Sequence, residues 1–471
     1  MSSIETIATS VRSGEASARS LVDEALKKAE GTGEFNIFIS LSAKRAQQRA
    51  DEIDSLVKTG KPVGRLAGVP FVAKDNFLAF GAATTAASHI LNNFEAPFQA
   101  TAIEKLEAEG AICIGKANLD AFAHGGSTEN SAFGPTRNAY DKTRVAGGSS
   151  GGSAVSVALE IVPFALGTDT GGSIRQPASF NGVVGVKPTY GTVSRYGVVA
   201  MASSTDTIGP ITKTIADAEL IMDIMAGRDA NDSTTLPDFF KPAEVPSDKK
   251  RIGIVKQFMD EGVDTEVREI ITRQIDMLKS NGHTVEEVDL PMVKYSVAMY
   301  YIIVPAEIAS NLARFDGIRY GRRSEEARTL DEIYGKSRDE GFMDENKRRI
   351  MVGNYVLSSG YFDAYYRQAQ KARTLLIRAF DDVFSEYDFL LGPVAPTSAF
   401  KVGENTSDPI KMYLSDVTTA PANLAGLPAM SVPAGKTETG LPVGLQLIGS
   451  RRSDAEMLAF AKMIEEGAIR G

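Results

Sequence analysis

Short apolar runs alternate with amphipathic segments along most of the 471-residue chain. The apolar runs have the length of strands, whereas the amphipathic segments repeat their apolar residues with a helical period. This alternation predicts an α/β sheet covered by helices on both faces. Strands are predicted at 68–75, 111–117, 161–169, 251–258, 283–291, 387–393, 427–435 and 441–450. Helices are predicted at 101–110, 153–160, 215–227, 264–282 and 453–466.

Two regions depart from this alternation. Residues 1–60 show helical patterns, and residues 305–385 form a long, charge-rich helical region with clustered arginines and tyrosines. The strand pattern returns after residue 385, so the second region is predicted to be an insertion into one α/β unit. We expect 1–471 to be a single domain, with its catalytic core at 61–212. The N-terminal helices are predicted at 2–11, 17–30 and 42–58.

The composition is that of an ordinary soluble globular protein, with 43% hydrophobic and 24% charged residues. A net charge of −9 argues against autonomous binding of nucleic acid, which needs a basic surface. It does not exclude a complex in which another chain binds the nucleic acid. The single Cys113 cannot form an internal disulfide, so a cytoplasmic location is expected. No signal-peptide core or run of membrane-span length is evident, so no membrane is expected.

The most informative stretch runs from Ala146 to Pro177 and contains two serine–glycine clusters separated by an apolar segment. Its seven glycines need a reason, because glycine costs backbone entropy on folding. Serine among glycines adds a nucleophile, and bared N–H groups could hold a developing oxyanion. The stretch therefore predicts an enzyme. The structural alternative is a glycine-rich turn that caps a helix beginning near Ser153.

Several common chemistries do not fit this chain. A G-x-S-x-G pattern centred on Ser149 lacks the strand that leads into a nucleophile elbow, and only three histidines are available as a base. The G-x-x-x-x-G-K match ending at Lys116 is followed by Ala117, where a P-loop needs Ser or Thr. S-x-x-K matches at Ser55 and Ser247 lack their companion motifs. No spacing of Cys, His or carboxylates suggests a metal site. A serine mechanism without histidine remains.

Lysine is the obvious base for such a mechanism. Lys74 follows an apolar strand pattern and precedes Asp75 and Asn76. A lysine at the end of a buried strand is unusual because desolvating an ammonium group is costly. Burial favours the neutral amine, which is the only form that can accept a proton. From these residues alone, a buried ion pair of Lys74 with Asp75 or another carboxylate is the alternative.

Three motifs together resemble the amidase signature family. They are KDN at 74–76, GGSSGGSA at 147–154 and GTDTGGSIRQP at 167–177. The resemblance covers nearly the whole chain and implies one large domain built on a central twisted mixed β-sheet. It also implies a Ser–cis-Ser–Lys triad.

In that triad Ser173 would be the nucleophile, and Ser149, after a cis peptide bond, would relay its proton to Lys74. By the same resemblance, main-chain N–H groups from Thr170 through Ser173 would form the oxyanion hole. A Cβ at Gly171 or Gly172 would block the approach of the substrate carbonyl group.

Further segments resemble one branch of this family, the A-type subunits of glutamyl-tRNA(Gln) amidotransferase. They lie at 116–138, 305–321, 347–375 and 412–435. This branch implies hydrolysis of glutamine, with the ammonia used by a partner to convert Glu-tRNA(Gln) to Gln-tRNA(Gln). Ala121 and His124 depart from the pattern, because Glu and Met are common at these positions of the loop over the pocket.

The resemblance also assigns groups that would recognise glutamine. Arg349 would grip the α-carboxylate through its planar fork, Asp416 would pair with the α-ammonium group, and Tyr300 and Gly125 would line the pocket. From the sequence alone, Arg349 lies in a basic run that is more typical of a solvated helix surface.

The implied partners are a B-type subunit that binds ATP, magnesium and tRNA, and a small C-type subunit that helps assembly into a heterotrimer. This chain would need no cofactor of its own and would meet tRNA only through the partner. Two alternatives remain open: a stand-alone amidase that acts on another small amide, and an inactive scaffold. The sequence does not say whether Asp-tRNA(Asn) is also served.

Overall fold

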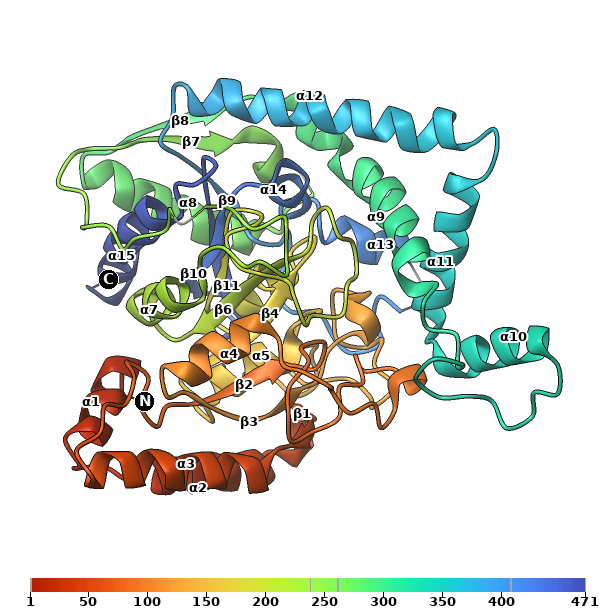
Figure 1. The fold of residues 1–471 in the computed structure, drawn as a ribbon. Coiled ribbons are helices and arrows are strands. Elements are labelled where there is room, and N and C mark those ends of the chain that lie inside the picture. The colour runs from red at the N-terminus through yellow and green to blue at the C-terminus, as the bar shows by residue number, and fades with distance from the viewer. Residues whose placement is uncertain (1, 238, 261, 407–408, 471) are drawn as a thin grey trace.

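The computed structural model describes residues 2–237, 239–260, 262–406 and 409–470. One mixed sheet of 11 strands runs through it in the order β1-β3-β2-β4-β6-β5-β10-β11-β9-β7-β8 (Figure 1). Strand β2 pairs in parallel with β3 and β4, and β7 pairs in parallel with β8 and β9. The strands are β1 Phe38–Leu41, β2 Pro70–Lys74, β3 Ile112–Ala117, β4 Phe164–Asp169, β5 Val184–Lys187, β6 Thr207–Thr212, β7 Arg251–Val255, β8 Thr284–Val288, β9 Phe389–Pro393, β10 Ala429–Lys436 and β11 Pro442–Gly449.

Helices cover both faces of this sheet, which confirms the predicted fold class. Successive strand residues point to opposite faces, and in β4 the side chains of Phe164 and Leu166 enter one apolar cluster whereas Ala165 enters another. The helices on the first face are α4 Thr101–Ala108, α7 Ile215–Met225, α8 Thr265–Ser280 and α15 Asp454–Arg470. Those on the second face include α2 Ala18–Gly31, α3 Ala43–Lys58, α5 Gly151–Ala158 and α6 Arg175–Phe180.

The expectation that residues 1–60 are helical is wrong at one point. Helices α1 (Ile4–Arg12), α2 and α3 form as predicted, but β1 lies between α2 and α3 and pairs antiparallel with β3. Strand β1 is short and only partly buried, so its pattern gives little signal and its pairing with a distant strand decides its conformation. Strands β5 and β6 are likewise absent from the predicted elements and form through pairing with distant strands.

The helical region begins earlier than predicted. It contains α9 Ser296–Leu312, α10 Leu330–Gly341, α11 Asp344–Leu357 and α12 Arg367–Phe384. The boundary at 305 is wrong because Pro305, a residue that usually marks a helix end, lies inside α9. These helices frame one side of the molecule, and α10 projects from its body (Figure 1).

One stretch of the described chain, Pro291–Leu312, is long and apolar enough to cross a membrane by length and composition. This finding corrects the expectation that no run reaches that length. Its most apolar window is 56% buried inside the protein, and α9 packs against α11, α12 and the short helix α14 (Ala420–Ala425). Packing in a separate apolar cluster therefore accounts for its apolar surface.

The sheet topology brings the lysine and serine motifs together. Parallel strands end at the same edge of a sheet, and β2 and β4 are parallel neighbours with Ala73 opposite Leu166. Lys74, the last residue of β2, therefore lies beside the segment that follows Gly167. That segment carries Ser173.

Candidate active site

Lys74 is fully buried at the end of β2 and contacts neutral oxygens. Its Nζ lies 2.7 Å from Ser149 Oγ and 2.8 Å from Thr168 Oγ1. It also donates to the Thr168 carbonyl oxygen at 3.3 Å. The described residues include no carboxylate within ion-pair distance of this amine.

The absence of a contacting carboxylate decides the charge of Lys74. Burial lowers its pKa to about 7, although Asp120, Asp169 and Asp206 raise it from a distance. The structural alternative of an ion pair with Asp75 is wrong, because Asp75 binds the buried Lys116 at 2.8 Å. Lys74 is thus poised to accept a proton from Ser149 at neutral pH.

The two serines lie in adjacent loops at the sheet edge. The peptide bond between Gly148 and Ser149 is cis, as the resemblance implied. The N–H of Ser150 donates to the carbonyl oxygen of Ser173 at 3.1 Å, which holds the two serine–glycine clusters side by side. Ser173 keeps 8% of its surface exposed whereas Ser149 keeps none, so the outer serine is the accessible one.

Gln176 fastens these loops together. Its Oε1 accepts the N–H of Gly148 at 2.8 Å, and its Nε2 donates to the carbonyl oxygen of Gly126 at 2.8 Å. Both ends of the side-chain amide are therefore satisfied, and the cis-peptide loop is fixed against the loop that carries Gly125.

The expected oxyanion donors divide into two groups. Within the described residues, the N–H groups of Thr170, Gly171 and Ser173 have no hydrogen-bond acceptor. The N–H of Gly172 instead already donates to Asp169 Oδ1 at 2.9 Å. A Cβ at Gly171 would come within 2.7 Å of the Tyr300 hydroxyl, which explains the need for glycine there.

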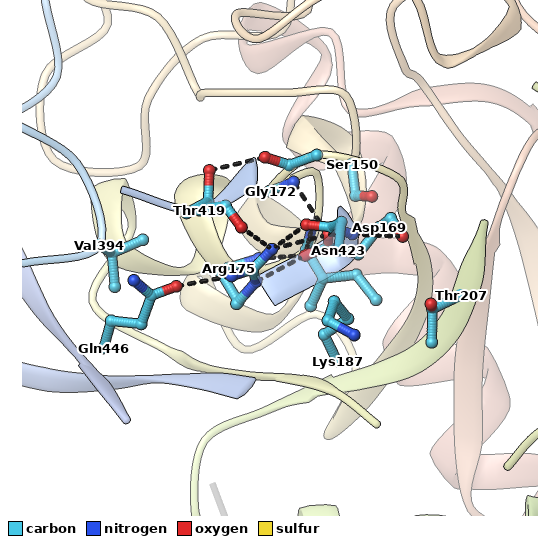
Figure 2. A network of polar contacts seen from close by, with 12 residues as sticks. Ser150, Asp169, Gly172, Arg175, Lys187, Thr207, Val394, Thr419, Asn423 and Gln446 are labelled. Carbon is cyan, nitrogen blue, oxygen red and sulfur yellow. Dashed lines mark hydrogen bonds and ion pairs between the residues drawn. The ribbon is translucent and has the colours of Figure 1, made fainter. Parts of the chain in front are cut away.

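A buried ion pair supports the nucleophile segment. Arg175 donates to both carboxylate oxygens of Asp169, through Nε and Nη2, at 3.0 Å each. Asp169 also accepts main-chain N–H groups from both sides of Ser173. Figure 2 shows Arg175 between this carboxylate and Gln446, which accepts from Nη1 at 2.6 Å.

The charge of Asp169 follows from these contacts. Burial raises the pKa of Asp169, but the Arg175 guanidinium outweighs it and holds this pKa well below its usual range. The carboxylate stays ionised and keeps its hydrogen bonds to the nucleophile segment. Arg175 also ties this segment to the C-terminal half of the chain through Thr419 and Asn423.

Next to the first serine–glycine loop lies a cavity of about 250 Å³, whose lining residues Gly126 and Ser127 lie against Gly148. The cavity lining does not include Ser149 or Ser173. It contains Gly125 and Arg349, as expected, together with the carboxylates of Asp120 and Glu345. A Cβ at Gly125 would overlap the Asp120 carboxyl group, so glycine is required there.

Arg349 is not a solvated helix charge. Its side chain is only 5% exposed and donates through Nε to Glu345 Oε1 at 2.8 Å. Its guanidinium lies 5.2 Å from the ring centre of Tyr301 and 5.6 Å from that of Tyr413. Glu345 Oε1 also accepts the Tyr413 hydroxyl at 3.0 Å, so the guanidinium is held in one orientation.

The other two expected pocket residues lie outside this cavity lining. Asp416 and Tyr300 are not among the residues that line the cavity. The Tyr301 hydroxyl donates to Asp416 Oδ2 at 3.0 Å, and Tyr301 stacks on Tyr413 at the cavity wall. Burial raises the pKa of Asp416 to about 7, against the opposing effects of Arg349 and the Tyr301 hydrogen bond.

Sequence reasoning missed residues that hold the predicted ones in place. Thr168, Asp169 and Arg175 stand within the GTDTGGSIRQP motif, where polar residues next to a buried strand were a usable signal. Glu345 and Tyr413 gave no such signal. Among the described residues, no group of three or more His, Cys, Asp or Glu side chains is placed to hold a metal ion.

Comparison with known proteins defines the class. A family model described as Amidase matches residues 20–458, and this chain belongs to the amidase family. The chain is 48% identical over 467 residues to the A-type subunit of the glutamyl-tRNA(Gln) amidotransferase of Koribacter versatilis, covering 98% of this chain and 97% of the relative. It is 52% identical over 435 residues to the corresponding subunit of Lactiplantibacillus plantarum, covering 91% and 88%.

A solved structure agrees with these relatives. The crystal structure of the A-type subunit of glutamyl-tRNA(Gln) amidotransferase from Thermotoga maritima matches with a TM-score of 0.79 at 42% identity. The match covers 95% of this chain and 91% of the other. The resemblance inferred from the motifs is confirmed.

Replacing Lys74 tests its role as the base. Because only the neutral amine accepts a proton, acylation of Ser173 should fall about tenfold for each pH unit below about 7 and level off above it. Lys74→Met and Lys74→Arg should both lose about 10²–10⁴-fold of the rate at every pH. The measurement is the pH dependence of the amide-hydrolysis rate. A Lys74→Arg variant with the wild-type pH profile would contradict this assignment.

Arg175→Ala should destabilise the protein by about 3–5 kcal/mol, because it leaves the buried Asp169 carboxylate without a counter-charge. Urea unfolding measures this loss. Arg367→Ala is the matched control, since Arg367 pairs with Asp363 on the surface and should contribute at most about 1 kcal/mol. Equal stabilities of the two variants would show that the Asp169–Arg175 pair does not support the fold.

Proposed function

We propose that this chain is the glutamine-hydrolysing subunit of a glutamyl-tRNA(Gln) amidotransferase. The observation that carries the proposal is the contact between the buried Lys74 and Ser149. A neighbouring cavity, whose lining residues Gly126 and Ser127 lie against Gly148, has Arg349 in its wall. The first feature supplies amide-cleaving chemistry, and the second supplies recognition of an amino acid.

The reaction begins when Ser173 Oγ attacks the side-chain amide carbon of glutamine. The Ser173 proton passes to Ser149 as Ser149 gives its own proton to Lys74. The free N–H groups of Thr170, Gly171 and Ser173 stabilise the oxyanion, a contribution of about 2.7–4 kcal/mol for each donor.

Collapse of this intermediate breaks the C–N bond. The departing nitrogen takes a proton back through Ser149 and leaves as ammonia. Water then attacks the γ-glutamyl ester on Ser173, and the same lysine accepts its proton. Glutamate is released, and the serine recovers its hydrogen.

Glutamine is recognised by its two backbone charges. Arg349 binds the α-carboxylate, and its contacts with Glu345 and the two tyrosine rings orient the fork. Asp416 pairs with the α-ammonium group and becomes fully ionised when that charge arrives. Tyr300 and Gly125 shape the space between these groups.

The ammonia serves a partner. We assign ATP, magnesium and tRNA to a B-type subunit, with a C-type subunit completing a heterotrimer in the cytoplasm. The relatives that match almost the full chain are named as subunits of such an amidotransferase. The end of α11 and the segment at 361–365 that precedes α12 support docking, because large apolar residues are exposed there and several touch one another. They are Met351, Val352, Tyr355, Leu357, Tyr361, Phe362 and Tyr365.

Ser173→Ala tests the function directly. In the assembled complex this variant should abolish glutamine-dependent amidation of Glu-tRNA(Gln) and leave amidation from added ammonium chloride unchanged, because only the ammonia source is lost. Both rates are measured as formation of Gln-tRNA(Gln). Ser156→Ala, on the buried α5, is a matched control. Loss of both activities in Ser173→Ala, or hydrolysis of unrelated amides without glutaminase activity, would overturn the proposal.

Arg349→Ala should raise the KM for glutamine by about tenfold or more, since a charge-assisted hydrogen bond to the carboxylate contributes about 1.5–3 kcal/mol. Amidation from ammonia should not change. Arg251→Ala is the control, because Arg251 is half exposed, pairs with Glu286 and is not among the residues that line the cavity. An unchanged KM in Arg349→Ala would remove this residue from the pocket.

A further inference from the structure

His124 stands in the wall of the same cavity and has no assigned task. Its side chain is fully buried. The loop that carries it holds Phe122 and Ala123 at φ values of 54° and 63°. Two consecutive non-glycine residues in the left-handed region are unfavourable, and such strain gathers at binding sites.

The hydrogen bonds of Asn346 define the tautomer of His124. Asn346 Oδ1 accepts the N–H of Met343 at 3.2 Å, so Nδ2 is the donor end of this amide. Nδ2 lies 2.8 Å from the Ala121 carbonyl oxygen and 2.7 Å from His124 Nδ1. Nδ1 must therefore accept, which leaves the ring hydrogen on Nε2.

The ring is uncharged as well as oriented. Burial, and to a lesser extent the nearby Arg349, lower the pKa of His124 well below its usual value. The neutral ring then has one acceptor, bound to Asn346, and one donor, Nε2–H. Within the described chain, His124 Nε2 is buried and has no hydrogen-bond partner.

An unmatched buried donor costs about 1–3 kcal/mol. A ligand that supplied an acceptor for this N–H would remove that cost. Arg349 and Asn346 lie three residues apart on the same face of α11. Both His124 and Arg349 line the cavity, close enough for the guanidinium charge to lower the pKa of His124. A carboxylate held by Arg349 has a second oxygen, with free lone pairs, available to His124.

We infer that His124 Nε2–H is a second donor to the α-carboxylate of the bound amino acid and that His124 is a specificity-determining residue of this chain. The inference rests on the proposed glutaminase function. The family resemblance places methionine at this position, and a thioether has no hydrogen to donate. The imidazole therefore adds a donor that the common methionine would not supply.

Two near-isosteric variants separate recognition from packing. His124→Gln places an amide N–H near the position of Nε2, whereas His124→Asn keeps a polar group near Nδ1 but removes the outer donor. In the assembled complex, His124→Asn should raise the KM for glutamine about tenfold or more with little change in kcat. His124→Gln should stay within about threefold of wild type. Equal effects of both variants on KM would overturn the inference.

A truncated substrate provides the matched control. 4-Aminobutanamide is glutamine without its α-carboxylate, so its rate of hydrolysis should be the same in wild type and His124→Asn. A loss with this amide as large as the loss with glutamine would assign His124 a structural role and overturn the inference.

Nuclear magnetic resonance of ¹⁵N-histidine gives a readout independent of turnover. The chain has only three histidines, so the imidazole signals are few. Without ligand, His124 should show the Nε2–H tautomer, and saturating L-glutamate should shift this signal. A hydrogen on Nδ1, or an Nε2–H signal that glutamate leaves unchanged, would overturn the inference.

The two readouts also distinguish the inference from the proposed function. Wild-type complex that hydrolyses no glutamine, but whose Nε2–H signal shifts with L-glutamate, would reject the function and retain the carboxylate contact. Normal glutaminase activity with an unshifted Nε2–H signal would reject only the contact.

Discussion

The site depends on a lysine that is buried without a counter-charge in contact. The chain provides its own comparison, because Lys74, the last residue of β2, and Lys116, the next-to-last residue of β3, lie on neighbouring parallel strands and are both fully buried. Lys116 binds the Asp75 carboxylate at 2.8 Å. Lys74 contacts only hydroxyl and carbonyl oxygens, so desolvation outweighs the more distant carboxylates and lowers its pKa to about 7. The difference between a structural and a reactive lysine is thus the placement of one carboxylate.

A reactive group of this kind needs rigid surroundings, and the Asp169–Arg175 pair provides them. The carboxylate accepts N–H groups of the nucleophile segment, while the guanidinium reaches Gln446 on β11 and Asn423 on α14. Segments far apart in the sequence therefore meet at one buried charge. The pair contributes little to stability in itself, because desolvation opposes its attraction, but removal of either partner leaves an isolated buried charge. We consider its role to be the positioning of Ser173.

Sequence reasoning succeeded where the signal is local. The strands that alternate with helices, the lysine at the end of β2 and the two serine–glycine clusters could all be located from pattern alone. Pairing could not. Asp75 follows Lys74 directly, and successive residues of an extended chain point to opposite sides, so the nearest carboxylate in sequence is the wrong partner in space. Strand β1 and the true start of the helical region at Ser296 were hidden in the same way, because contacts with distant segments decide them.

The surroundings of Arg349 could not be predicted from the sequence for the same reason. Arg349 resembles a surface charge in sequence because nothing there reveals that two tyrosine rings and Glu345 enclose it. Burial also raises the pKa of Asp416 to about 7, and the Tyr301 hydroxyl that binds Asp416 belongs to one of the two rings around the Arg349 guanidinium. In the function that we propose, the α-carboxylate of glutamine pairs with Arg349 and its α-ammonium group pairs with Asp416, and the arriving ammonium group favours the ionised form of this carboxylate. Under this proposal, a ligand with only one of the two charges would leave either Arg349 or Asp416 without a charged partner from the ligand. Burial of these two side chains would therefore contribute to the selection of an amino acid.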